Sequence, residues 1–230
     1  MDLLDMILRT IPGFWEAAWI TLKITFVSVV IGGILGVFIS LLRSSSSNIL
    51  CGIARVYISF IQGIPLIVQI SILYFGISSV FDLSNFWAGA IALGIYSSTS
   101  IAGIFRRSMQ RVDQGQMEAA KSLGMNKRQI VGSVIGPQAL KLSIAPMANQ
   151  FIITLKDSSL VYIIGIADIF AFANREGANS FQQFEAYLTA GLYYLILVSV
   201  FSYVAYKLEN HFDTEKRNQR PIQGGDSILN

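Results

Sequence analysis

The sequence predicts an all-α integral membrane protein with five transmembrane helices. Of its 230 residues, 53% are hydrophobic and only 13% are charged, whereas soluble domains carry roughly 25% charged residues. The apolar residues gather in five long stretches, and about 20 apolar residues suffice to cross a bilayer as a helix. If the stretches cross alternately, nearly all basic residues fall on one side. That side is expected to be cytoplasmic, which places the N-terminus outside and the C-terminus in the cytoplasm.

The same composition argues against several classes of function. The net charge of +3 is explained by basic residues beside apolar segments, so it gives no support for a nucleic-acid partner. His211 is the only histidine and Cys51 the only cysteine, so we propose no metal site. The chain contains no Gly-Lys-Ser or Gly-Lys-Thr phosphate loop and no Ser/His/Asp set. We therefore expect that it is not an enzyme and binds no cofactor itself.

The first predicted span follows a short lead. Residues 1–13 are expected to form an amphipathic segment along the membrane interface that ends at Pro12. The first span, residues 14–42, is long enough to cross with a tilt. Gly32 and Gly36 lie one turn apart within it, and small residues at this spacing permit close helix packing.

The second predicted span, residues 53–81, contains Pro65 between two glutamines. Proline kinks a membrane helix and frees a carbonyl, which is tolerated where protein or water covers the gap. Gln62 and Gln69 are therefore candidates for a polar path through the bundle.

The third predicted span, residues 86–105, contains a run of hydroxyl side chains from Tyr96 to Ser100. Such hydroxyls often bond to backbone carbonyls one turn earlier. Alternatively they face a polar path, with Ser100 as the candidate. Both interpretations stay open on sequence alone.

A loop at residues 113–137 follows, which we call the coupling loop. Residues 117–123 are good helix formers with one serine, and Gly124 suits the left-handed residue that closes a helix. Asn126 is a favoured N-cap for a second short helix, expected to carry Lys127 and Arg128 outward. Considered alone, this segment is also compatible with an ordinary cytoplasmic loop.

The fourth predicted span, residues 142–166, carries several polar residues. Lys156 and Asp157 are costly inside a bilayer, at about 2.5–3.5 kcal/mol each on insertion scales. They are expected to face a cavity with Asn149 and Ser159, or else to lie at the far membrane boundary.

The rest of the chain is predicted to contain one more span. Residues 168–185 form a polar external loop, residues 186–206 the fifth span, and residues 207–230 a charged cytoplasmic tail that frays. The spans and the coupling loop together make residues 14–206 a single transmembrane domain.

The coupling loop carries a specific resemblance. Glu118-Ala119-Ala120, three residues, Gly124 and then Pro137 resemble the EAA loop of permease subunits in type I ABC importers. In that family the loop forms coupling helices that dock on the ATPase subunit. The resemblance departs at Gly136, where the family usually has leucine. The residues to which it assigns the ATPase contact are Glu118, Ala119, Ala120, Gly124, Asn126, Lys127 and Arg128.

Two further segments resemble the polar amino acid permeases, the histidine, glutamine and arginine permease family. Residues 156–160, Lys-Asp-Ser-Ser-Leu, closely match one segment of that family, and residues 63–66 are similar to its Gly-Thr-Pro-Leu region. The family's Ala-Tyr-x-x-Glu-x-x-Arg pattern keeps Arg106 but has Gly103 in place of the acid. This loss argues against a strongly cationic substrate.

The resemblance implies the transmembrane subunit of an ATP-driven importer of a polar amino acid or amino-acid derivative, in a bacterial cytoplasmic membrane. The implied partners are an ABC ATPase in two copies that binds ATP and Mg, a second permease subunit that is the same or a related chain, an extracytoplasmic solute-binding protein, and lipid. The candidate substrate-pathway residues are Gln62, Gln69, Ser100, Asn149, Lys156, Asp157 and Ser159. Other possibilities are an importer permease for a different small polar solute, a secondary transporter, or a non-transporting membrane anchor.

Overall fold

A computed structural model describes residues 3–218, except for the side chains of residues 78–79 and 211–218. Within this range the chain consists of helices joined by short turns. In chain order the elements are α1 (Leu3–Arg43), α2 (Asn48–Gly63), α3 (Leu66–Ser71), the π-helical η1 (Ile72–Ile77), α4 (Ser78–Phe81), α5 (Asn85–Gln110), α6 (Gln114–Ser122), α7 (Lys127–Gln129), the π-helical η2 (Ile130–Ile135), α8 (Gly136–Asp157), the 3-10 helix η3 (Ser158–Ile164), α9 (Ile169–Ser180) and α10 (Gln183–Asn218).

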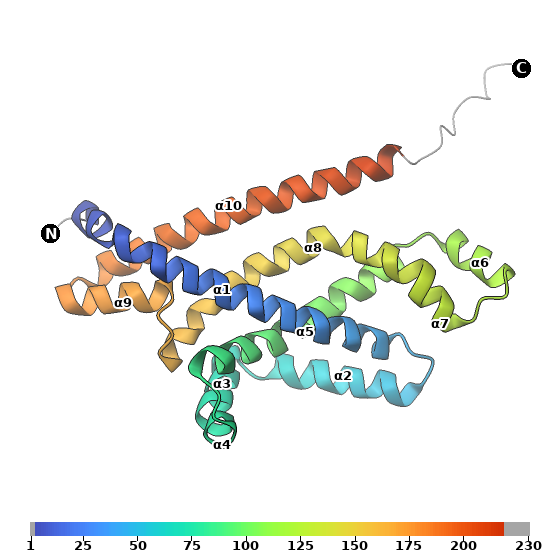
Figure 1. The fold of residues 1–230 in the computed structure, drawn as a ribbon, viewed down its shortest axis with the longest axis horizontal. Helices are drawn as coiled ribbons and strands as arrows, with labels where there is room; N and C mark the ends of the chain where they lie inside the picture. Colours follow the sequence, from blue (N-terminus) through green and yellow to red (C-terminus); the bar gives the residue numbers. More distant parts are fainter. Residues whose placement is uncertain (1–2, 219–230) are drawn as a thin grey trace, which may run out of the picture.

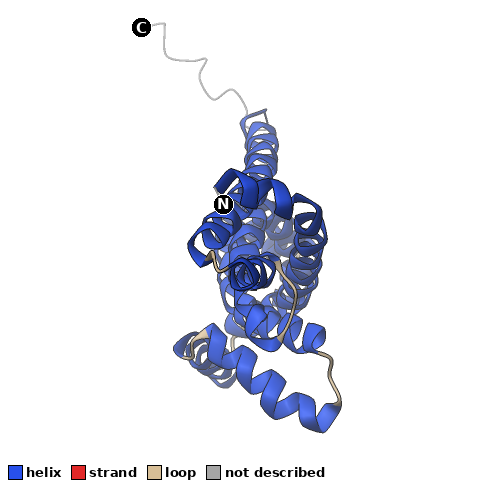
Figure 2. Cartoon of the chain, turned by 90° about the vertical axis from the view of Figure 1, so that its left-hand side faces the viewer, coloured by secondary structure: helices blue, strands red, loops and turns tan. Residues whose placement is uncertain are grey.

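The long helices form one elongated bundle around α5. In Figure 1, α1, α5, α8 and α10 run along the long axis, with α6 and α7 at one end and α9 beside the N-terminal end of α1 at the other. Figure 2 looks along this axis and shows the helices of the bundle side by side. Of the most apolar stretch of each helix, 72% is buried in α5 but only 17% in α10. The centre of the bundle is therefore α5, and α10 lies at its edge.

The contact between α1 and α5 depends on glycines. A β-carbon added at Gly36 would lie 2.7 Å from the Ile101 side chain and 2.8 Å from the Ser98 carbonyl oxygen. One added at Gly32 would lie 2.9 Å from the carbonyl oxygen of Gly94. The close packing predicted for Gly32 and Gly36 is confirmed.

The hydroxyl run on α5 makes both kinds of hydrogen bond. Ser98 and Thr99 donate to the carbonyl oxygens of residues three positions earlier, at 2.6 and 2.9 Å. The hydroxyls of Ser97 and Thr154 on α8 are 3.0 Å apart, and those of Tyr57 on α2 and Ser98 are 2.9 Å apart. These groups thus hold α5 to its neighbours as well as satisfying its backbone.

Residues 1–13, predicted as an amphipathic lead, form the first turns of α1, which begins at Leu3 and has Pro12 inside it; their position along the membrane interface stays a prediction. Its first turns pack against α10. The hydroxyls of Thr10 and Tyr193 are 2.8 Å apart, and the Phe14 ring stacks on the Tyr193 ring with centroids 3.9 Å apart. These contacts fix the first turns of α1 against α10.

The kink predicted at Pro65 is a complete break. Helices α2 and α3 meet at 96°, and Ile64 is extended, as expected for a residue before proline. Between residues 3 and 218, four helical segments are long and apolar enough to cross a membrane, and a fifth exists only if this bent pair counts as one span. Five spans with the N-terminus outside stay a prediction.

Residues 168–185 were predicted as a loop, but the structure places α9 there. Asp168 starts this helix, because its carboxylate accepts a hydrogen bond from the Ala171 N–H at 2.9 Å. The carboxylate also accepts one from the Tyr194 hydroxyl, at 2.9 Å. Polar composition suggested a loop, whereas the N-cap and the packing of Ile169 and Ala173 produce a helix. The last helix, α10, continues through the predicted tail to Asn218, and the rest of the tail lies outside the described residues.

We expect Gly36→Ala to destabilise the folded protein by about 1–3 kcal/mol, because overpacking costs this much when neighbours cannot move. Gly33→Ala is the matched control, since a β-carbon there meets nothing within 4 Å. The control should be neutral or slightly stabilising. Thermal unfolding in detergent measures both, and equal melting temperatures would contradict the packing described.

A second expectation concerns pH. Burial raises the pKa of Asp168 from 3.8 to about 6, although its hydrogen bonds oppose the shift. The folded state then binds a proton more tightly than the unfolded state between these values, so stability should fall as pH rises from about 4 to 6. Asp168→Asn keeps the capping oxygen but cannot ionise. Relative to this variant, the wild type should lose roughly 3 kcal/mol between pH 4 and 7, as measured by thermal unfolding; parallel pH profiles would refute the expectation.

Candidate functional site

The coupling loop forms two short helices around a glycine turn. The Asp113 carboxylate accepts a hydrogen bond from the Gly115 N–H at 2.6 Å and caps α6. Gly124 follows with φ at 75°, the left-handed conformation predicted for it. Asn126 and Gln129 form a reciprocal capping box that starts α7. The local structure predicted from the residue types is confirmed.

One of the predicted contact residues faces inward. Ala120 is only 4% exposed and packs in a cluster with Phe105 of α5, Ile130 of η2 and Ala139 of α8. It anchors α6 to the bundle, so it does not offer its own surface to another protein. Glu118, Ala119 and Gly124 are exposed at the end of the bundle, where a partner can reach them.

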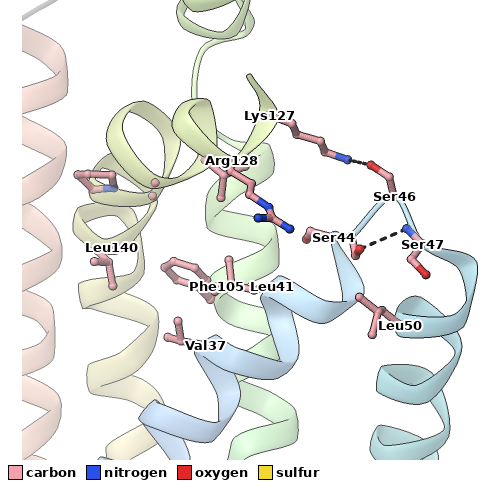
Figure 3. A pocket seen from close by; sticks show the side chains of 15 residues that line it. Val37, Leu41, Ser44, Ser46, Ser47, Leu50, Phe105, Lys127, Arg128 and Leu140 are labelled. Atoms are coloured by element: carbon pink, nitrogen blue, oxygen red, sulfur yellow. Dashed lines mark hydrogen bonds between the residues drawn. The ribbon is translucent and has the colours of Figure 1, made fainter. Parts of the chain in front are cut away.

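The two basic residues of α7 are exposed but turn toward their own chain. The Lys127 ammonium donates a hydrogen bond to the Ser46 hydroxyl at 2.8 Å. Figure 3 shows Lys127 and Arg128 directed to the turn between α1 and α2. Both line a cavity of about 890 Å³ between that turn and η2. A partner that binds Lys127 or Arg128 would therefore contact this chain beside the turn between α1 and α2.

Sequence reasoning missed two apolar side chains of the same surface. Leu123 is 82% exposed and Met117 is 37% exposed. Both belong to the segment at the far end of the bundle in Figure 1. An apolar residue in a short segment of small and charged residues between two spans is the signal that could have identified them. We call these two residues, together with the exposed Glu118 and Gly124, the α6 surface.

A second site is a polar cavity of about 530 Å³ between α2, α5 and α8. Gln62, Ser100 and Asn149, three of the candidate pathway residues, line it, one from each helix; that the cavity is part of a substrate path stays a prediction. The Gln62 amide also donates to the Thr99 hydroxyl at 3.3 Å. The remaining polar residues of its wall, which the sequence analysis did not assign to a path, are Arg43, Thr99, Arg107 and Gln150.

Gln69 has a different role from the one predicted. It is buried, and its amide donates to the carbonyl oxygens of Ile61 at 2.7 Å and Ile64 at 2.9 Å. The break at Pro65 interrupts the helical hydrogen bonding of this segment. In an apolar environment such carbonyl groups need a donor, so Gln69 stabilises the break and does not line the polar cavity.

Lys156, Asp157 and Ser159 also lie away from the polar cavity. They occur where α8 passes into η3, with Lys156 exposed and the other two half-buried. The structure does not bring them together with Gln62, Ser100 and Asn149. In the part of the chain that the structure describes, no cluster of three His, Cys, Asp or Glu residues could hold a metal ion.

Comparisons with known proteins agree on one family. The profile of the binding-protein-dependent transport system inner membrane component family matches residues 28–214. The Bacillus subtilis (strain 168) arginine transport system permease protein ArtQ is 35% identical over 201 residues, which cover 86% of this chain and 92% of that protein. The Escherichia coli (strain K12) glutamine transport system permease protein GlnP is 31% identical over 202 residues, with 86% and 92% covered. A crystal structure of an amino acid ABC transporter with histidines superimposes with a TM-score of 0.82 at 37% identity, covering 92% of this chain and 99% of that one.

We expect Gln69→Leu to destabilise the protein by about 1–3 kcal/mol, because it removes the amide donor from a buried and a partly buried carbonyl oxygen. Gln62→Leu is the matched control, since the Gln62 amide bonds only to a side-chain hydroxyl. Thermal unfolding in detergent distinguishes them. A Gln62→Leu variant that is as unstable as Gln69→Leu would show that the carbonyl contacts are not what matters.

Proposed function

The chain belongs to the family of binding-protein-dependent transport system inner membrane components, and on that basis we propose that it imports a polar amino acid or amino-acid derivative. It is a multi-pass inner-membrane permease. The substrate class is supported by the relatives named for arginine and glutamine transport and by the amino acid transporter with the same fold. The polar cavity between α2, α5 and α8 is the proposed part of the pathway within this chain.

The observation that carries the proposal is the connection between the α6 surface and the polar cavity. Ala120 of α6 packs on Phe105 of α5 and Ala139 of α8. Helices α5 and α8 then run on to line the cavity with Ser100 and Asn149. Because close-packed side chains transmit displacement, a force applied to α6 moves two walls of the cavity.

The energy for transport is proposed to come from a partner. An ABC ATPase in two copies, with ATP and Mg bound to it, would dock on the α6 surface. Its hydrolysis cycle would rock the helices between inward and outward openings. A second permease subunit, identical or related, would complete the pathway, since two subunits packed about a two-fold axis are the common arrangement in oligomers.

The opposite end of the bundle is the proposed docking site for the solute-binding protein. Helix α9 lies there, far from α6 (Figure 1). Phe181, directly after α9, is 95% exposed. This end of the bundle is assigned to the solute-binding protein because it lies opposite the end proposed for the ATPase.

We expect Leu123→Ser to reduce co-purification of the ATPase about tenfold, because an apolar anchor at the centre of an interface typically contributes more than 1 kcal/mol. Solute-stimulated ATP hydrolysis in proteoliposomes should fall with it. The fold should be unaffected, since this side chain is 82% exposed.

Phe181→Ser is the matched control for Leu123→Ser. It removes an equally exposed apolar side chain from the other end of the bundle, so it should leave ATPase co-purification unchanged. Loss of the ATPase in both variants would indicate general damage, and retention in both would count against docking on the α6 surface.

A further inference from the structure

The charged residues that line the polar cavity are all basic. Two of its twelve described lining residues, Arg43 and Arg107, carry guanidinium groups, and none is acidic. The other polar groups are neutral amides and hydroxyls, contributed by Gln62, Thr99, Ser100, Asn149 and Gln150. The wall therefore has a net positive charge.

No acidic side chain among the described residues pairs with either guanidinium. Among the described residues the one ion pair joins Arg9 and Glu176, near the opposite end of the bundle. The Nε atom of Arg43 is buried and has no hydrogen-bond partner. A buried donor without a partner is costly, and the cost is greater for a charged group. Arg43 therefore carries its charge on the cavity wall with no counter-ion among the described residues.

Gly103 is what allows the second guanidinium to lie on the cavity wall. The Nη1 atom of Arg107 lies 3.2 Å from the place that a β-carbon at position 103 would take. A side chain there would displace the guanidinium group, and an acidic one would neutralise it. The positive charge of the wall therefore depends on the absence of a side chain at position 103.

These groups match a carboxylate. Guanidinium groups bind carboxylates through paired, charge-assisted hydrogen bonds, and Arg107 is exposed at this wall, where a ligand can reach it. The amide and hydroxyl oxygens of Gln62, Ser100 and Asn149 provide acceptors for an ammonium group. A cationic side chain would instead meet two uncompensated positive charges.

We propose that the polar cavity selects solutes that carry a second carboxylate, such as acidic amino acids or their anionic derivatives, over cationic ones. The proposal rests on the function proposed above. It assigns Arg43 and Arg107 as carboxylate ligands and Gly103 as the position that sets the sign of the cavity's charge. The arginine-transporting relative is expected to differ from this chain in that sign.

The test is direct binding to the purified complex of this permease with its ATPase, without the solute-binding protein, so that the receptor's own preference does not enter. Dissociation constants are measured by calorimetry for L-glutamate, L-glutamine and L-arginine. We expect L-glutamate to bind at least tenfold more tightly than L-arginine. Equal affinity for the three, tighter binding of L-arginine, or no binding of any would overturn the proposal.

Three variants locate the effect. Arg107→Gln should weaken L-glutamate binding about tenfold, the loss expected for one charge-assisted hydrogen-bonded contact. Arg111→Gln, one helical turn further on and outside the cavity wall, should change it less than twofold. Gly103→Glu should reverse the order of L-glutamate and L-arginine. An Arg111→Gln effect as large as that of Arg107→Gln would show general surface charge and would overturn the assignment.

A measurement of uptake distinguishes failure of the proposed importer function from failure of the charge selectivity. Uptake by the complete complex with its receptor in proteoliposomes measures whether any amino acid is transported. Uptake of a neutral or cationic amino acid, together with cavity binding that favours L-arginine, would leave the importer function intact and refute only the charge selectivity. Absence of uptake for every amino acid, with glutamate-selective binding retained, would refute the function and keep the cavity assignment.

Discussion

The close contact between α1 and α5 is the constraint on which the rest of the structure depends. Helices in a membrane gain nothing from hiding apolar surface from lipid, so their association depends on packing and on hydrogen bonds between them. Gly32, Gly36 and Gly94 let the two backbones approach, and the Ser97 and Thr154 hydroxyls join α5 to α8. With α5 fixed on two sides, the positions of the polar cavity and of the coupling loop are both determined.

The coupling loop and the cavity are two ends of one mechanical unit. Ala120, Phe105 and Ala139 pack together at the end of the bundle, and the helices that carry the last two form walls of the cavity. A small side chain at position 120 therefore serves internal packing, while its exposed neighbours, Glu118 and Leu123, are available to a partner. Within this short segment, Ala120 thus holds the loop in place, whereas Glu118 and Leu123 are exposed to a partner.

The break at Pro65 shows how a membrane protein accommodates irregular backbone. Proline ends α2 and turns the chain by 96°, which exposes carbonyl groups in a region that offers them no water. The amide of Gln69 supplies the missing donors. The Gln62 side chain does not bond to these carbonyl groups and lines the polar cavity instead. Two glutamines of the same segment consequently have unrelated roles.

The sequence by itself determined the fold class, the local structure of the coupling loop and the family resemblance, because these follow from composition and from residues close together in the chain. It also identified Gln62, Ser100 and Asn149, which the fold brings to one cavity. Only the tertiary structure decided that Ala120 is buried, that Gln69 satisfies the backbone, that α9 is a helix and that Lys156, Asp157 and Ser159 lie elsewhere. Arg43 and Arg107 are among the basic residues that the sequence assigns to the cytoplasmic side, and only the packing of α1, α2, α5 and α8 places them on the cavity wall. The direction in which a polar side chain points inside a bundle depends on contacts between residues far apart in sequence, which neither spacing nor composition contains.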